Sequence, residues 1–139
     1  MNIVSFSGGK DSTAMLFMMI EKGIQIDKII SIDTPKEYPQ MYEHIHKVQE
    51  RIHPLKIEIY TIDFDYYFAK HVRDTPKSVG VEGYGWPGFL YRWCTGLKLE
   101  QIRKIKMGIP DIVDFIGIAF DERKRQKKHT YKKIIYDYL

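Results

Sequence analysis

The sequence predicts an α/β fold, a doubly wound and mainly parallel sheet with helices on both faces. Two observations lead to this prediction. Short β-branched apolar runs alternate along the chain with longer segments whose apolar residues recur at helical spacing. The connections between these segments are short, which favours right-handed crossovers between parallel strands. A length of 139 residues suits one core, so we expect a single domain over residues 1–139.

The first strand and helix are expected at residues 3–6 and 13–22. The run 3–6 is short and mostly apolar, and the helical segment is apolar nearly all round between Ala14 and Ile20. We therefore expect this helix to be buried on most of its surface. Residues 28–32 are rich in β-branched side chains, which predicts a second strand covered on both faces of a parallel sheet.

A proline indicates where the second helix begins. Pro39 disfavours helical geometry at Tyr38, so we expect residues 33–38 to form a loop and the helix to begin at Pro39. The apolar residues that follow have a clear amphipathic spacing until Pro54 ends the helix. Apolar and polar residues then alternate over 55–62, which predicts a third strand.

The segment 63–93 differs in kind, because it contains nine aromatic residues and four glycines. We expect a helix over 64–72 and a long loop over 75–90, and loops of that length are often functional. Three interpretations stay open. The aromatic residues cover the sheet edge, they form a lid over a substrate, or they stack against single-stranded bases.

Regular patterning resumes after this segment. Helical spacing over 95–107 and a nearly all-apolar run over 112–118 predict the last helix and a fourth strand. A mixed-charge run with an excess of basic residues follows at 121–128. Such runs are usually solvated surface, although its place after a strand leaves open that one or two of its cations reach a bound phosphate.

The turn after the first expected strand has the sequence Ser-Gly-Gly-Lys-Asp-Ser, residues 7–12. Gly8 and Gly9 allow positive φ and a close approach of the backbone to an anion. The helix that follows adds unpaired N–H groups and the positive end of its dipole. Strand, glycine turn and helix together therefore direct a row of backbone N–H groups at a phosphate.

Side chains of the same turn have matching chemistry. Lys10 supplies a charge that can follow phosphate oxygens as a bond breaks, and Ser7 and Ser12 can donate hydroxyl hydrogen bonds. Asp11 or Ser12 can cap the helix. Asp11 can also help to hold a divalent ion on the phosphates, so we expect Mg²⁺.

Two other phosphate-binding loops are excluded by the same residues. A Walker loop needs Gly-x-x-x-x-Gly-Lys followed by Ser or Thr, but Asp11 follows Lys10 and Val4 stands where the first glycine belongs. The dinucleotide fingerprint needs three spaced glycines, and this turn has two. Ligands of parallel sheets bind beyond the carboxyl ends of the strands. The turn and the loop that begins at Asp33 both lie there, so we expect them to converge on one crevice.

The composition limits the partners. A net charge of +4 and a pI near 9.0 favour anionic partners, which nucleotides satisfy as well as nucleic acid does. The longest apolar run is far too short for a membrane span, so we expect no membrane partner and a cytoplasmic protein. Cys94 is the sole cysteine, which excludes an internal disulfide and an iron–sulfur cluster held by several thiolates.

Residues 7–12 match the PP-loop, the Ser-Gly-Gly-x-Asp-Ser signature of the adenine-nucleotide α-hydrolases and ATP pyrophosphatases. With three further segments, in order along the chain, they resemble the phosphoadenosine phosphosulfate reductase family. That family includes sulfonucleotide reductases, the small subunit of a sulfate adenylyltransferase, eukaryotic FAD synthetases and DNA-phosphorothioation proteins. The further segments are Asp33-Thr34 with Glu37-Tyr38-Pro39, Tyr91-Arg92-Trp93-Cys94-Thr95 with Lys98, and Gly117 with Asp121-Glu122.

The resemblance implies one adenine-nucleotide-binding domain and a role for each matched residue. The binding residues would be Ser7, Gly8, Gly9, Lys10, Asp11, Ser12, Asp33, Thr34, Lys98 and Gly117. Asp33 and Thr34 would lie near the adenosine, while Arg92 and Lys98 would line the anion site. Lys10 and Arg92 would be catalytic, since cations and fixed N–H groups stabilise the charge that grows on phosphoryl oxygens.

Three functions stay open. The first is adenylyl transfer from ATP with release of pyrophosphate. The second is a sulfonucleotide reductase that acts on phosphoadenosine phosphosulfate with an external thiol. Cys94 lies beside Arg92 and a helix start, which could lower its pKa, but we interpret it as structural. The third is a non-catalytic module that binds a nucleotide or associates with nucleic acid. Because the family's chains generally continue beyond the position of Leu139, a second subunit or another copy could complete the site.

Overall fold

The computed structural model describes residues 1–74 and 77–119. Its elements are β1 (Asn2–Ser5), α1 (Lys10–Glu21), β2 (Lys28–Asp33), α2 (Pro39–Arg51), β3 (Ile57–Thr61), α3 (Phe64–Ala69), α4 (Trp93–Lys106) and β4 (Val113–Ile116). The four strands form one sheet in the order β3-β2-β1-β4, and every neighbouring pair is parallel. The expected α/β fold with a parallel sheet is therefore confirmed. The charged run at 121–128 lies outside the described residues.

The middle of the sheet is apolar because its strands are covered on both faces. Val4 of β1 pairs in register with Ile29 of β2 on one side and with Phe115 of β4 on the other. All three side chains are buried, as is Ile3. β3 lies at an edge, and Ile59 in it is 54% exposed. The apolar runs of β1 and β2 therefore correspond to the central strands, and the alternating run to the edge strand β3. The nearly all-apolar run of β4 lies at the other edge.

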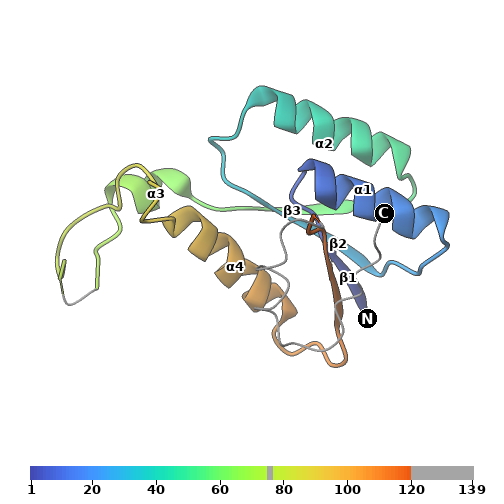
Figure 1. The fold of residues 1–139 in the computed structure, drawn as a ribbon. Coiled ribbons are helices and arrows are strands. Elements are labelled where there is room, and N and C mark those ends of the chain that lie inside the picture. Colours follow the sequence, from blue (N-terminus) through green and yellow to red (C-terminus); the bar gives the residue numbers. More distant parts are fainter. Residues whose placement is uncertain (75–76, 120–139) are drawn as a thin grey trace.

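Helices cover both faces of this sheet (Figure 1). α1 and α2 lie side by side on one face, and α4 lies on the other. Strands β2 and β3 follow β1 toward one edge of the sheet, whereas β4 pairs with the other side of β1, as in a doubly wound sheet. The core between the layers consists of Val4, Phe6, Leu16, Met19, Ile29, Val48, Ile52 and Phe115.

The first helix is less buried than its composition suggests. Of its residues only Ser12, Leu16 and Met19 are buried, while Ala14 and Ile20 are exposed. The expectation of burial on most of the surface is therefore wrong. The physical reason is that α1 belongs to an outer layer, so one face of the helix packs on the sheet and the opposite face meets solvent.

Element boundaries differ from the expected ones where a tertiary contact decides them. The start of α2 at Pro39 is confirmed. α4 begins at Trp93, two residues early, because the buried Trp93 ring packs 5.0 Å from the Phe64 ring centroid. α3 ends at Ala69, short of residue 72, because Val72 pairs with Glu82 in an isolated antiparallel bridge.

The aromatic segment forms an arm, defined here as residues 64–74 and 77–92. Figure 1 shows it extending away from the sheet rather than over it. α4 then returns the chain to the sheet, where Lys106 pairs with Asp114 of β4 at 2.6 Å and donates to Ser5 of β1 at 3.1 Å. These contacts fix the C-terminal end of α4 to β1 and β4. The arm therefore precedes the N-terminal end of a helix that is held to the sheet at its C-terminal end.

Candidate functional site

The turn between β1 and α1 has the backbone that its glycines allow. Gly8 has a φ of +76°, and a Cβ there would lie 2.8 Å from Met41 Sδ and 3.2 Å from Ile45 Cγ1. Any larger residue at this position would be strained and would collide with α2. Gly9 is the N-cap of α1, with extended backbone at φ −76° and ψ 165°. The turn is therefore seated against α2 through Gly8.

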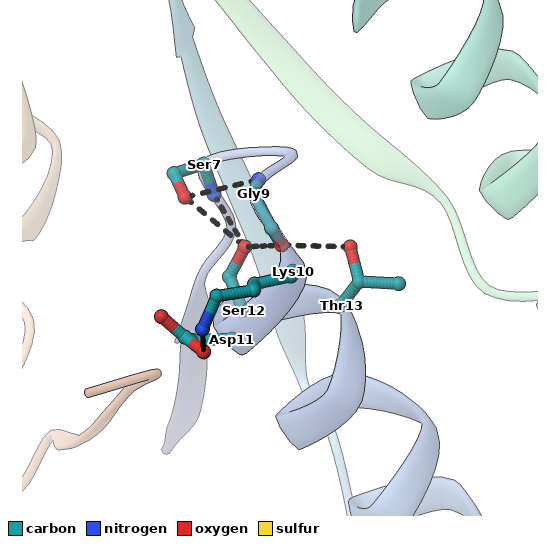
Figure 2. A network of polar contacts seen from close by, with 6 residues as sticks. All are labelled: Ser7, Gly9, Lys10, Asp11, Ser12 and Thr13. Atoms are coloured by element: carbon teal, nitrogen blue, oxygen red, sulfur yellow. Dashed lines mark hydrogen bonds and ion pairs between the residues drawn. The ribbon is translucent and has the colours of Figure 1, made fainter. Parts of the chain in front are cut away.

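Hydroxyl groups of the turn bond to its own backbone (Figure 2). Ser12 Oγ donates to the Gly9 carbonyl at 3.0 Å and lies 3.0 Å from Ser7 Oγ. The Ser7 amide donates to Ser12 Oγ, and the Gly9 amide to Ser7 Oγ, each at 3.3 Å. Both amide contacts are longer than the usual N–H···O range of about 2.7–3.2 Å. Two N–H groups that we expected to face an anion are thus held, at long distance, by serine oxygens.

The first turn of α1 contains the residues that we expected to cap it. The helix begins at Lys10, so Asp11 and Ser12 lie inside it, and the N-cap Gly9 has no side chain to offer. The prediction that Asp11 or Ser12 caps the N-terminus of this helix is therefore wrong. Thr13 Oγ1 instead donates to the Gly9 carbonyl at 2.9 Å and lies 3.0 Å from His44 Nε2 of α2. These contacts tie the start of α1 to α2.

Lys10 extends from this turn into solvent. Its side chain is 85% exposed, and its ammonium forms an ion pair with Asp11 Oδ1 at 2.7 Å (Figure 2). Exposed ion pairs of this kind contribute about 0–1 kcal/mol. The pair with Asp11 therefore adds little to the stability of the turn.

The second expected loop begins where β2 ends. Asp33 accepts a hydrogen bond from Tyr42 OH of α2 at 2.9 Å. Burial, together with this bond to the Asp33 carboxylate, raises the pKa of Tyr42. The buried Thr34 donates to Glu37 Oε1 at 3.0 Å. The same Glu37 oxygen pairs with Lys98 of α4 at 2.9 Å, and this hydrogen bond holds the pKa of Glu37 below its ordinary value.

Ser7, Asp33 and Lys98 line one small cavity at the carboxyl end of the sheet. Its volume is about 30 Å³, which is room for roughly one water molecule. The full lining is Ser7, Ser31, Ile32, Asp33, Glu37, Met41, Tyr42, Ile45, Ile59 and Lys98. The turn and the Asp33 loop therefore converge as expected. The Glu37–Lys98 pair and the Tyr42–Asp33 hydrogen bond both form part of its wall.

Gly117 follows β4 and lies against the start of α1. A Cβ at Gly117 would come within 2.6 Å of the Ser12 amide nitrogen and 2.7 Å of the Asp11 carbonyl carbon. Both neighbours are backbone atoms that cannot move aside. The glycine is therefore required by close packing of two backbone segments, one of which is the turn itself.

Arg92 lies apart from the first cavity. Its guanidinium carbon is 5.2 Å from the centroid of the exposed Phe89 ring, on the arm. It borders a second, larger cavity of about 320 Å³. That cavity is lined by Tyr84, Tyr91, Arg92, Trp93, Gly96 and Leu97. The structure thus brings Lys98 to the first cavity and Arg92 to the second, so the catalytic role of Arg92 stays a prediction.

The cysteine lies in the first turn of α4 and is partly buried. Burial raises the pKa of the Cys94 thiol, although Lys98 acts in the opposite direction. The thiol therefore stays protonated at neutral pH, which disfavours a nucleophilic role. Partial burial of the Cys94 thiol is consistent with its interpretation as a structural residue.

Within residues 1–74 and 77–119, no group of three or more His, Cys, Asp or Glu side chains is placed to hold a metal ion. A metal at this site would need oxygens from a bound phosphate in addition to a carboxylate such as that of Asp11. In the same part of the chain, no helix is long and apolar enough to cross a membrane.

Some residues of the first cavity had no signal in the sequence. Tyr42 follows the ordinary amphipathic spacing of α2, yet it bonds to Asp33. Ser31 lies in an apolar strand, yet it is buried in the cavity wall. Glu37 belongs to a matched segment, but its pairing with Lys98 spans 61 residues of sequence. Pairs so far apart become visible only when the sheet and α4 are assembled.

Comparison with known proteins gives three findings. The phosphoadenosine phosphosulfate reductase domain matches residues 1–137. The uncharacterized protein MJ0066 of Methanocaldococcus jannaschii is 30% identical over 141 aligned positions, which cover 94% of this chain and 26% of that protein. The chain thus spans about a quarter of the length of the curated relative that it matches. No solved structure matches the chain significantly.

Proposed function

The chain belongs to the phosphoadenosine phosphosulfate reductase family, and from this premise we propose that it binds ATP at residues 7–12 and transfers the adenylyl group to an acceptor, releasing pyrophosphate. One observation carries the proposal. Ser7, Asp33 and Lys98 come from three separate elements and line one cavity beyond the carboxyl ends of parallel strands. Ligands of such sheets bind at that position.

The turn supports binding of the phosphates. Its Ser7 and Gly9 amides make contacts of 3.3 Å to neutral hydroxyl oxygens. A charged phosphate oxygen accepts a shorter hydrogen bond that is about twice as strong. A phosphate would therefore displace the hydroxyl groups, which could then rotate and donate to it as well. Lys10 would exchange Asp11 for the same phosphate, and Asp11 would be released toward a Mg²⁺ ion bound to the phosphates.

The Asp33 side of the cavity supports binding of the adenosine. The Asp33 carboxylate lies at the end of β2, and a carboxylate can accept hydrogen bonds from ribose hydroxyls or from an adenine amino group. At about 30 Å³ the cavity is closed to an adenosine. Binding would require the Lys98–Glu37 pair to part. Lys98 would then be available to an anionic oxygen of the nucleotide.

The reaction itself needs little beyond positioning and charge. A nucleophilic oxygen of the acceptor forms a bond to the α-phosphorus, and the bond from that phosphorus to the bridging oxygen breaks. Pyrophosphate leaves with the electron pair, and the acceptor loses one proton. Lys10 and the amides of the turn would stabilise the charge that grows on the α-phosphoryl oxygens, and loss of one such donor typically costs about 10²–10³ in rate. Mg²⁺ would neutralise charge on the leaving pyrophosphate.

A reductase of phosphoadenosine phosphosulfate is the weaker proposal. Such chemistry needs a reactive thiolate, and Cys94 is poorly suited to supply it because burial raises the pKa of its thiol, so the thiol would have to come from an external donor. We therefore expect Cys94→Ser to leave nucleotide binding unchanged.

The test is nucleotide-dependent thermal stabilisation of the protein and its variants. We expect Mg²⁺–ATP to raise Tm, since a ligand at about 100 times its Kd adds about 2.7 kcal/mol of stability. Lys10→Ala should lose most of this shift, because it removes the cation of the turn. Lys47→Ala is the matched control, since it removes the same charge from an exposed position on α2. Release of pyrophosphate from ATP, measured with candidate acceptors, then tests the reaction.

Two results would contradict the proposal. If Lys10→Ala kept the full shift, the anion would bind elsewhere. If phosphoadenosine phosphosulfate stabilised the protein and ATP did not, the hypothesis of a reductase would replace that of adenylyl transfer.

A further inference from the structure

The arm exposes a group of large apolar side chains close together in sequence. We call Trp86, Phe89, Leu90 and Tyr91 the platform, and their exposed fractions are 74%, 85%, 95% and 46%. Soluble proteins rarely expose contiguous apolar surface of this kind without a partner. The buried rings beneath, including Phe64 and Trp93, already supply the arm with its own packing. Trp86 and Tyr91 take part in this packing, since the Trp86 ring lies 5.0 Å from that of Phe68 and the Tyr91 ring 5.6 Å from that of Tyr84. Phe89 and Leu90 are the most exposed members of the platform.

Cations lie over aromatic rings in the same region. Arg92 lies 5.2 Å from the Phe89 ring centroid, and Arg73 lies 5.7 Å from that of Tyr84. Over the arm the sequence has four Lys and Arg against three Asp and Glu, a net charge of +1. The positive charge next to the rings thus comes from the individual cations Arg73 and Arg92 rather than from a large net excess.

A cavity opens beside the platform. Its volume of about 320 Å³ is far larger than a water molecule needs. Tyr84, Tyr91 and Trp93 give it aromatic walls, and Arg92 borders it. It shares no lining residue with the cavity at the carboxyl end of the sheet. Aromatic faces suit a flat ring, and a guanidinium suits the phosphate attached to one.

We propose that the arm binds single-stranded nucleic acid, with bases stacked on Phe89, Tyr91 and the adjoining cavity while Arg92 contacts the backbone phosphate. Exposed rings interleaved with cations are the means by which proteins hold single strands without reading their sequence. A protein partner or a second copy would use the apolar area but would not require the two arginines that lie over the rings. The proposal stands independently of the reaction at residues 7–12.

The test is fluorescence anisotropy of a labelled thymidine single strand of about 12 nucleotides, a length within the usual site size. Binding should weaken between about 50 and 200 mM salt, because counterions are released from the strand. Phe89→Leu should weaken it about tenfold, whereas Phe89→Tyr should keep it, since stacking needs a ring and not merely apolar volume. Met107→Ala is the control, because Met107 is 80% exposed but lies beyond α4, outside the arm.

The other outcomes overturn the proposal. These are absence of binding, equal affinity of Phe89→Leu and the native protein, and equal affinity for a duplex of the same length. A concentration-dependent mass in light scattering that Phe89→Leu abolishes would instead assign the platform to a second copy. Mg²⁺–ATP stabilisation should be the same in Phe89→Leu and the native protein, so failure here is distinct from failure of the proposed reaction.

Discussion

The turn at residues 7–12 and the arm are built in opposite ways. In the turn, Gly8 is pressed against α2, Ser12 is buried, and hydroxyl groups bond to the turn's own backbone. In the arm, Phe89 and Leu90 are almost wholly exposed. The turn is held by close backbone contacts to its neighbours, whereas the arm joins the sheet through the helix α4 and the end of β3.

This difference indicates what each region can recognise. Under the proposed function, a turn held by close contacts would select a small anion of fixed shape, because its amides could not follow a ligand of another size. An exposed aromatic surface tolerates many partners with a flat face. The two regions meet in α4, where Leu97 borders the arm's cavity and Lys98 borders the cavity beneath the turn.

The largest expected effect comes from breaking the backbone contact behind the turn. Gly117→Ala places a Cβ about 2.6 Å from the Ser12 amide nitrogen, so the two segments must separate. We expect a loss of about 3 kcal/mol in the free energy of unfolding, the upper end for overpacking. Gly96→Ala is the control, because nothing lies within 4 Å of its Cβ and alanine favours the helix. Chemical denaturation measures both, and an unchanged midpoint for Gly117→Ala would mean that the turn is loosely packed.

A smaller effect is expected from the equivalent change in the arm. Gly83 has a φ of +65°, and a Cβ there would collide with the Phe68 carbonyl. Because the arm projects from the sheet, Gly83→Ala should loosen it by about 2 kcal/mol without unfolding the sheet. Both tryptophans, Trp86 and Trp93, belong to the arm or its junction with α4, so their fluorescence should change while far-UV circular dichroism stays nearly native.

A control variant separates the two causes of the destabilisation by Gly83→Ala, which are backbone strain at a positive φ and the collision of the new Cβ. Gly80 also has a positive φ, of +79°, but a Cβ there meets nothing within 4 Å, so Gly80→Ala should show the strain without the collision. If Gly83→Ala unfolded the whole protein in one transition, the arm and the sheet would be a single cooperative unit, and the contrast between the two regions would fail.

The smallest effect concerns the ion pair between the Asp33 loop and α4. The pKa of Glu37 is lowered from 4.5, chiefly by its hydrogen bond from Lys98. The pair therefore stabilises the fold above pH 4.5, and this contribution is lost as the pH falls through the lower pKa of the folded state. Both side chains are about one-third exposed, so we expect at most about 1 kcal/mol.

Glu37→Gln should remove this contribution at neutral pH and match the native protein below the folded-state pKa. Glu43→Gln, at an exposed position on α2, is the matched control and should leave the profile unchanged. A difference between Glu37→Gln and the native protein that persisted in acid would show that the side chain acts through packing rather than charge.

Local rules predicted much of the fold, and tertiary contacts decided the exceptions. Pro39 marks the start of α2 because proline restricts the residue before it, which is a property of two neighbouring residues. The early start of α4 depends instead on packing of Trp93 against Phe64, 29 residues away. The exposed face of α1 could not be predicted, because composition does not tell which layer a helix occupies.

Some features of the candidate site could likewise be predicted from local rules, whereas others depend on tertiary contacts. The position of the turn and its convergence with Asp33 follow from strand order, since parallel strands bring their carboxyl ends to one edge. The separation of Arg92 from Lys98 does not follow from strand order. Arg92 precedes α4 and Lys98 lies six residues later within it, and the two side chains border different cavities. The sequence by itself determined a parallel α/β sheet and a glycine turn at its carboxyl edge, because periodicity and φ preferences are local. Only the tertiary structure decided which cavity each cation borders and that the aromatic arm extends away from the sheet, because both depend on how distant segments pack.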